Sequence, residues 1–123
     1  MGGWYDLYAQ HAFINFNGLR QHGYTKEARQ SRIIVGPWPH ALSTSTRTGD
    51  IDFGASSMVD LDAEELRWFD YWLKEIDNGI ADEPPLRLFI MGVNQWRDEH
   101  DWPLARTPLQ QWQLHSARHP NPV

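Results

Sequence analysis

The sequence has no cysteine, no long apolar run and no excess of basic charge. Without cysteine the chain can form no disulfide and can use no thiolate. Cysteine usage therefore does not indicate whether the protein works in an oxidising or a reducing compartment. No apolar run approaches the roughly 20 residues that cross a bilayer. The formal net charge is −5 at pH 7, so the basic footprint of a nucleic-acid-binding protein is missing. We therefore expect neither a membrane nor a nucleic acid as partner.

The composition that remains is that of a globular domain. The chain has 123 residues, of which 41% are hydrophobic and 22% are charged, and this length suits one ordinary domain. Seven residues are tryptophan. Tryptophan buries a large area and needs a partner for its N–H, so we expect these rings between packed layers.

The first 80 residues or so have an α/β pattern. An apolar stripe at steps of four, four and three predicts a helix over 7–22, and its members are Tyr8, Ala12, Phe16 and Leu19. The β-branched run before Gly36 predicts a strand over 32–36 that is covered on both faces, as in a parallel sheet. The segment 41–58 is rich in Ser, Thr, Gly and Asp, and this composition predicts a long loop.

A second helix is predicted over 62–76. Its apolar stripe should be buried, and the stripe consists of Leu66, Phe69, Leu73 and Ile76. Asp62 and Glu65 resemble a capping box at the start. Asp70 and Lys74 are spaced for an ion pair, and Asn78-Gly79 predicts a left-handed cap at the end.

The pattern changes at Glu83-Pro84-Pro85, which reads as a stiff linker. Strands are predicted over 86–91 and 111–115, with a polar, turn-rich segment over 97–103 between them. The sequence therefore predicts an α/β region over 1–83 and an all-β region over 84–123.

Two ionisable residues stand where hydrolytic enzymes built on a sheet place their chemistry. Asp6 precedes the first helix, and His40 lies four residues beyond the end of the strand 32–36. Catalytic groups of α/β sheets lie at the carboxyl ends of strands, and Asp followed by His is the latter part of the order Ser…Asp…His. We expect the Asp6 carboxylate within hydrogen-bond reach of the His40 ring, where Asp6 orients the ring and His40 serves as general base and acid.

Simpler interpretations of these residues stay open. Asp6 could be only a helix cap, and His40 could be a surface loop histidine. The aromatic residues Trp4, Tyr5 and Trp38 flank the pair. They could wall an acyl pocket, or they could belong to the core.

A nucleophile is not evident in the chain. Ser56 and Ser57 lie in Gly-Ala-Ser-Ser-Met, which lacks the second glycine of a nucleophile elbow, and they follow Asp6 and His40 in the wrong order. The segment Asp98-Glu99-His100-Asp101 is interpreted as a solvated acidic turn, because adjacent residues point apart. A metal-dependent hydrolase that uses His40 and acidic loops is kept as an alternative, although we expect no cofactor and no metal.

The motifs together resemble one known family. The chain is similar to the C-terminal part of the CocE/NonD hydrolases, which include cocaine esterases, α-amino acid ester hydrolases, glutaryl-cephalosporin acylases and X-prolyl dipeptidyl peptidases. The resemblance covers nearly the whole chain. It is carried by these segments: Gly3-Trp4-Tyr5-Asp6, Gly36-Pro37-Trp38-Pro39-His40, Asp52-Phe53-Gly54, the helix from Leu66 to Lys74, Asp77-Asn78-Gly79, the run from Glu83 to Gly92, Asn94-Gln95-Trp96-Arg97 and Trp102-Pro103-Leu104-Ala105.

The resemblance implies a fragment of a serine acyl hydrolase. The chain would hold the C-terminal part of an α/β-hydrolase domain over 1–83 and the beginning of a jelly-roll domain over 84–123. Asp6 and His40 would be catalytic, whereas the serine elbow, the oxyanion hole and the helical cap would lie upstream, and most of the jelly roll would lie beyond Val123. The substrate would be an acyl ester, an amide or a peptide.

Two further expectations follow for such a fragment. It should be inactive alone, and it should associate with a second copy or with the missing N-terminal part, because its helices have little sheet to cover. A different class of function stays open: the chain could be a truncated remnant that acts as a structural or interaction module without catalysis.

Overall fold

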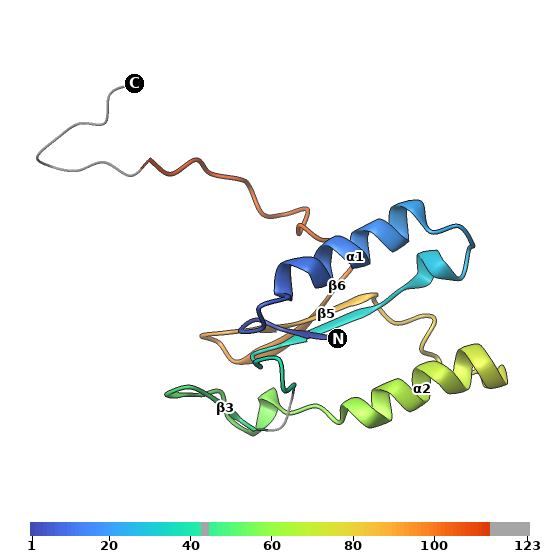
Figure 1. The fold of residues 1–123 in the computed structure, drawn as a ribbon, viewed down its shortest axis with the longest axis horizontal. Coiled ribbons are helices and arrows are strands. Elements are labelled where there is room, and N and C mark those ends of the chain that lie inside the picture. Colours follow the sequence, from blue (N-terminus) through green and yellow to red (C-terminus); the bar gives the residue numbers. More distant parts are fainter. Residues whose placement is uncertain (43–44, 114–123) are drawn as a thin grey trace, which may run out of the picture.

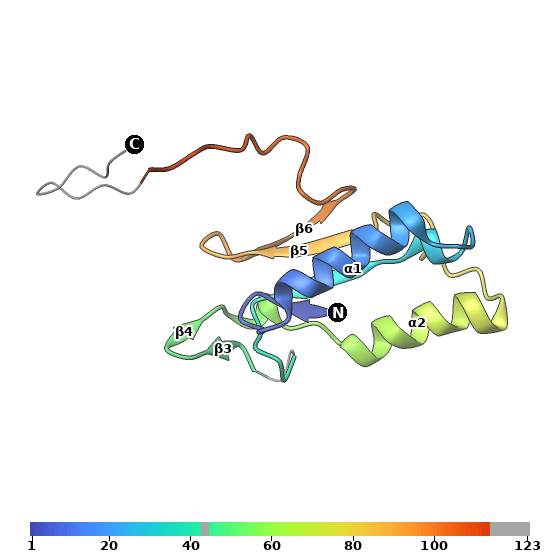
Figure 2. The same ribbon diagram turned by 45° about the horizontal axis from the view of Figure 1, so that its top comes forward.

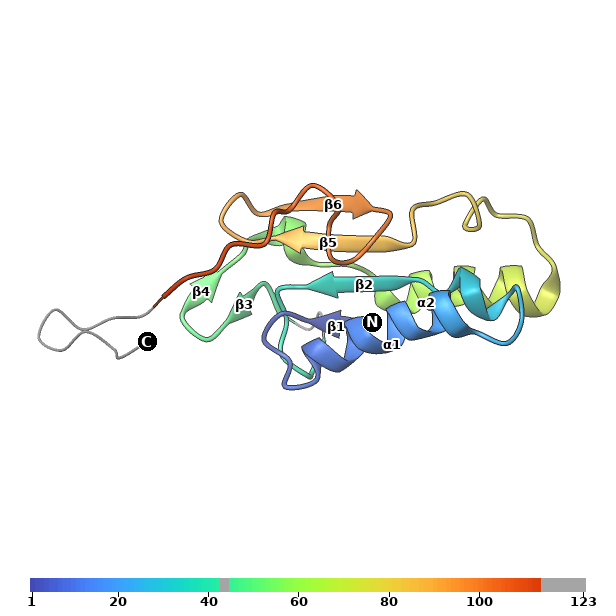
Figure 3. The same ribbon diagram turned by 90° about the horizontal axis from the view of Figure 1, so that it is seen from above.

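The computed structural model describes residues 1–42 and 45–113 of the chain. Its centre is a four-stranded sheet in the order β1-β2-β5-β6, seen from above in Figure 3. The strands are β1 (Gly2–Gly3), β2 (Ile33–Gly36), β5 (Leu86–Ile90) and β6 (Gln95–Glu99).

The sheet is mixed: β1, β2 and β5 are parallel, and β6 is antiparallel to β5. β1 pairs in parallel with β2, where Gly3 lies opposite Gly36, and β2 pairs in parallel with β5. The carboxyl ends of β1 and β2 therefore meet at the same edge of the sheet. β2 is buried throughout, as the apolar run predicted.

The C-terminal strand of the sheet was predicted incorrectly. β6 pairs with β5 as an antiparallel neighbour and occupies part of the segment that was predicted as polar turns over 97–103. Most of its residues are exposed, with Trp96 partly covered and Glu99 buried. The predicted strand over 111–115 is not formed at 111–113, and the rest of it lies outside the described residues.

Two helices lie on opposite sides of the sheet (Figure 1). They are α1 (Ala9–His22) and α2 (Leu61–Lys74). A short 3₁₀ helix, η1 (Ala28–Gln30), follows α1, and another, η2 (Ala55–Ser57), precedes α2. Across the described residues, neither helix is long and apolar enough to span a bilayer.

The predicted long loop over 41–58 contains regular structure. Within it β3 (Arg47–Thr48) and β4 (Ile51–Asp52) pair antiparallel as a separate two-stranded hairpin. Figure 2 shows this hairpin beyond the end of the four-stranded sheet. The polar composition of the segment hid the hairpin, because such short strands leave no clear alternation in the sequence.

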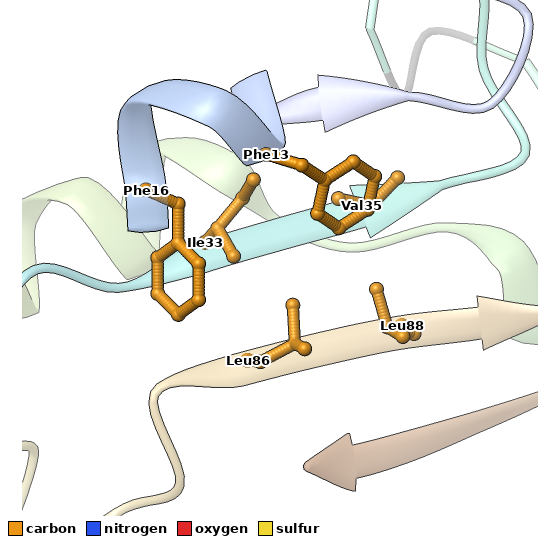
Figure 4. Packing of buried hydrophobic residues seen from close by; sticks show 6 residues of the cluster. All are labelled: Phe13, Phe16, Ile33, Val35, Leu86 and Leu88. Carbon is orange, nitrogen blue, oxygen red and sulfur yellow. The ribbon is translucent and has the colours of Figure 1, made fainter. Parts of the chain in front are cut away.

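The main core lies between α1 and the sheet. Figure 4 shows how two helical rings face aliphatic side chains of β2 and β5, and the cluster consists of Phe13, Phe16, Ile33, Val35, Leu86 and Leu88. The predicted stripe of α1 is partly wrong, because Tyr8 and Leu19 are exposed and Phe13 is buried. The helix begins at Ala9 rather than residue 7, and its buried line runs through Phe13 and Phe16.

The predicted buried stripe of α2 is wrong for this structure. Its four members remain between 47% and 75% exposed, and no residue of α2 is buried. The half-buried residues of the helix include Trp68 and Trp72 instead. The apolar periodicity marks a face that could be covered, but within the described chain nothing covers it.

The ends of α2 also differ from the prediction. Asp60 is the N-cap, and its carboxylate accepts a hydrogen bond of 3.0 Å from the Ala63 N–H, so the capping box that starts at Asp62 is wrong. The helix ends at Glu75, which adopts a left-handed φ of 57°, before the predicted Asn78-Gly79. The ion pair between Asp70 and Lys74, at 2.6 Å, is confirmed.

The residues Pro84 and Pro85 lead directly into the sheet. The Pro85 carbonyl accepts a hydrogen bond of 2.8 Å from the Ile33 N–H, and β5 then becomes the neighbour of β2. The division of the chain into regions 1–83 and 84–123 stays a prediction, as do the hydrolase domain and the jelly roll.

Candidate active site

The loops that carry Asp6 and His40 leave adjacent parallel strands at the same edge of the sheet. Backbone hydrogen bonds continue the pairing beyond the strands: the Trp4 N–H donates to the Gly36 carbonyl at 2.8 Å, and the Tyr5 N–H donates to the Trp38 carbonyl at 3.1 Å. The two loops are therefore held in a fixed register up to the candidate residues.

The loop before His40 is anchored by the buried side chain of Trp38. This ring is 1% exposed, and its Nε1 donates to the Ser57 carbonyl at 3.2 Å. The Thr48 hydroxyl donates to the Pro37 carbonyl at 2.7 Å. Proline also restricts the backbone of this turn, so His40 projects from a rigid support.

Asp6 and His40 are in direct contact. The distance from Asp6 Oδ2 to His40 Nδ1 is 3.1 Å, which is the reach expected from the sequence. The Asp6 side chain is 8% exposed, whereas the His40 side chain is 71% exposed. The pair thus combines a covered carboxylate with an imidazole that an incoming group can approach.

The charge of Asp6 fixes the direction of this hydrogen bond. The Tyr8 N–H, which donates to Asp6 Oδ1 at 2.9 Å, is the main influence that lowers the pKa of Asp6; burial acts against it, and His40 adds to it. The carboxylate is therefore ionised at neutral pH and can only accept a hydrogen bond. His40 Nδ1 must then carry the proton, and the neutral ring keeps its lone pair on Nε2, the form that a general base needs.

Tyr8 is the residue that sequence reasoning missed at this site. It was assigned to the buried stripe of the first helix, but its N–H binds Asp6 and its ring lies edge-on to the His40 ring, with centroids 5.5 Å apart. Aspartate often accepts the N–H of the residue two positions later, and this spacing was the available signal. Asp6 is not the N-cap of α1, since that position is Tyr8.

The three flanking aromatic residues lie in different surroundings. Trp4 donates its Nε1 hydrogen to the Phe89 carbonyl at 2.8 Å and packs partly buried against the core. Trp38 is fully buried, and Tyr5 is 44% exposed. Tyr5 is thus the most accessible of the three, and their role as pocket walls stays a prediction.

The remaining polar candidates have structural partners. The Ser57 hydroxyl donates to the Gly54 carbonyl at 2.7 Å, and the Ser56 hydroxyl donates to the Asn94 carbonyl at 3.3 Å. Among the described residues, neither hydroxyl is bonded to His40.

The predicted acidic turn at 98–101 is corrected in part. Asp98 and Glu99 belong to β6, and Glu99 is only 8% exposed. Arg106 binds the Glu99 carboxylate, and this hydrogen bonding lowers the pKa of Glu99. Over residues 1–42 and 45–113, no group of three His, Cys, Asp or Glu side chains is placed to hold a metal ion.

Comparison with known proteins gives esterases as relatives. The chain is 36% identical over 108 residues to the protein named cocaine esterase from Rhodococcus sp. (strain MB1 Bresler). It is 32% identical over 114 residues to proteins named "Putative serine esterase" from Mycobacterium bovis and Mycobacterium tuberculosis. Each match covers 85% of this chain and 18% of the relative. No family model matches the chain.

These similarities support a relationship to CocE/NonD-like esterases. The chain spans less than a fifth of the length of the relatives it matches. The esterase names belong to those longer proteins.

Proposed function

We propose that this chain supplies the aspartate and the histidine of a serine-esterase triad. Asp6 would orient the His40 ring, and His40 would act as general base and then as general acid. The observation that carries the proposal is the 3.1 Å contact between Asp6 Oδ2 and His40 Nδ1. The esterase names of the relatives support the same chemistry.

The proposed reaction needs a serine from another segment or polypeptide. As its oxygen attacks the acyl carbon, His40 Nε2 takes the hydroxyl proton, and Asp6 stabilises the imidazolium without being protonated. The ring then gives this proton to the leaving alkoxide, and an acyl-enzyme remains. Water repeats the sequence and releases the acid. The exposure of the His40 side chain, 71%, leaves room for this serine.

The proposed substrate class is a carboxylic ester, which the names of the relatives favour. An amide or an X-prolyl peptide would use the same pair of residues. We further propose that 1–83 is the end of an α/β-hydrolase domain and that 84–123 begins a jelly roll. Parallel pairing of β1 with β2 and the placement of a helix on each side of the sheet (Figure 1) support the first part.

A segment exchange tests the proposal. The part of the Rhodococcus cocaine esterase that aligns with this chain, 18% of its length, is replaced by this chain, and ester hydrolysis is measured. We expect hydrolysis in the chimera, and its loss on His40→Ala. His22→Ala, at the far end of α1, is the matched control and should retain activity. Equal activity in the His40→Ala chimera would exclude His40 as the base.

The isolated chain gives a second arm of this test. Without the nucleophile a triad enzyme keeps little beyond binding, so we expect no turnover of a generic ester. Turnover by pure chain that His40→Ala abolishes would reveal a nucleophile within it. The alternative of a non-catalytic interaction module predicts no hydrolysis in any arm, even when the chimera is folded.

A further inference from the structure

A cleft of about 290 Å³ at the other end of the sheet gathers cationic side chains. Arg20 reaches it from the last turn of α1, Arg29 from η1, and Arg32 from the residue before β2. Asp6 lies just before the start of α1, and 14 helical residues measure about 20 Å. The cleft is therefore a site separate from the Asp6–His40 pair.

The cleft is lined by more arginines than carboxylates. The Arg20 guanidinium lies over the Phe16 ring at 5.4 Å, and Arg29 Nε donates to the Gly23 carbonyl at 2.8 Å. In the described part of the chain neither has an acidic partner. Two guanidinium groups thus keep their charge available, which is notable in a chain with a formal net charge of −5.

One glutamate lines the cleft, and its charge is already opposed. Glu83 accepts from Arg32 at 2.7 Å and also from Arg67. Burial alone would raise the pKa of Glu83, but the hydrogen bonds from Arg67 and Arg32 outweigh it and hold the pKa below its usual range. Glu83 therefore fixes Arg32 at the edge of the cleft as an ionised partner.

A second, independent feature of the cleft is an unsatisfied donor. Trp72 lines it, and the indole Nε1 of Trp72 is buried without a hydrogen-bond partner among the described residues. A buried N–H without an acceptor is costly, and such groups often indicate a missing partner. An oxyanion in the cleft would provide the acceptor.

An apolar cavity adjoins the cationic cleft. It measures about 250 Å³ and shares Arg32, Trp68 and Ile80 with the cleft. Ile34 and Phe69 add apolar surface to it, while Glu64 and Glu65 line it as well, and Glu64 is paired with Arg67. A ligand that fits both spaces has a charged head and an apolar body.

We infer that this cleft binds a small amphipathic anion with an oxyanion head, either a carboxylate or a phosphate. The head lies among Arg20, Arg29 and Arg32, where planar guanidinium groups match its oxygens. The apolar body extends along Trp68 and Ile80 into the adjoining cavity.

Calorimetric titration of the full chain tests this inference. The probes are octanoate and octyl phosphate, with acetate and octanol as the head-only and body-only controls. We expect saturable binding of at least one anionic amphiphile, tighter than either control; the better of the two identifies the head group. Binding of acetate or octanol as tight as both amphiphiles, or no binding, would overturn the inference.

Three variants locate the binding. Arg20→Gln should weaken it about tenfold or more, because hydrogen bonds to charged groups are strong. Trp72→Phe should weaken it without loss of thermal stability, since it removes a donor that has no partner in the free chain. Arg47→Gln removes the same charge outside the cleft, where Arg47 faces Asp52, and should have no effect. Unchanged binding in both cleft variants, or equal weakening by Arg47→Gln, would contradict the assignment.

Discussion

A β-carbon placed on Gly3 would lie 1.9 Å from the carbonyl oxygen of Trp38. The two loops that carry Asp6 and His40 approach each other at this point, and the Tyr5 N–H donates to the same carbonyl at 3.1 Å. Only glycine permits so close a backbone approach. The contact between Gly3 and Trp38 therefore sets the separation of the candidate catalytic residues.

The first prediction concerns this approach. Gly3→Ala should lower the free energy of unfolding by about 1–3 kcal/mol, the cost of forcing an extra carbon into a packed site. The obstacle is backbone, not the end of a flexible side chain, so the loops must separate. Urea denaturation of the chain measures the change.

Gly18→Ala is the matched control for that substitution. Gly18 lies within α1 with nothing within 4 Å of the added carbon, so alanine should stabilise the chain by about 0.5–1 kcal/mol. Destabilisation of both variants to the same extent would mean that the close approach of the loops has no special role.

The second prediction separates two candidate caps of α2. Asp60→Ala should destabilise the chain by about 1 kcal/mol, because its carboxylate binds the Ala63 N–H. Asp62→Ala, which the sequence pattern favoured as the cap, should cost only about 0.3 kcal/mol through the helix dipole. Thermal denaturation compares them, and a larger loss in Asp62→Ala would restore the sequence-based assignment.

The third prediction concerns Glu83, which joins Arg67 of α2 to Arg32 before β2. Glu83→Gln should destabilise the chain by about 1–2 kcal/mol at pH 7. This loss is smaller than that for a fully buried charged hydrogen bond, because solvent screens the partly exposed carboxylate. Glu65→Gln, on an α2 residue with no ion pair in the described chain, should be nearly neutral.

The effect of Glu83 should depend on pH in one direction. Its pKa is lowered in the folded chain, so its contribution is complete above the unfolded value, about 4.3, and is lost as the pH falls through the lower folded value. Denaturation at pH 7 and at successively lower pH should show Glu83→Gln converging on the unchanged chain below about pH 4. A difference that grows toward acid would contradict this assignment.

The fourth prediction concerns the apolar face of α2. Leu73 is 75% exposed and shares its face with the other members of the exposed stripe. Exposed apolar area costs about 25 cal/mol per Å², so we expect the chain to self-associate through this face. Sedimentation over a dilution series should show a mass that rises with concentration, and Leu73→Gln should reduce the rise.

Leu109→Gln controls for the loss of any exposed leucine. Leu109 is 94% exposed and lies outside the helices and strands, so its replacement should leave association unchanged. A single species of monomer mass at every concentration would show that the face of α2 needs no cover.

The parts that could be predicted from sequence depend on short-range signals. The β-branched run of β2 indicated a buried strand, and the placement of Asp6 and His40 beyond strand ends indicated that they would meet. These signals hold because adjacent parallel strands bring their following loops to one edge. The ion pair of Asp70 with Lys74 is likewise fixed by helical spacing.

The parts that could not be predicted depend on tertiary context. Periodicity identifies an apolar face on α2 but does not say whether anything covers it, and Leu73 is exposed here. β6 carries charged residues such as Arg97 and Asp98, which predicted a turn. It forms a strand because it pairs with β5, and that pairing cannot be read from the local pattern. The interaction of Tyr8 with Asp6 could be predicted only if the first residue of α1 were known, and the sequence pattern placed that residue two positions too early.

The most direct test of the central claim, that Asp6 and His40 act as one unit, is a double-mutant cycle in the esterase chimera. Asp6→Asn alone should lower kcat by roughly 10⁴, as expected when the orienting carboxylate is lost. Because both residues serve one proton transfer, Asp6→Asn combined with His40→Ala should be no less active than His40→Ala alone. Losses that multiply in the double variant would show that the two residues act independently and would contradict the proposed pair.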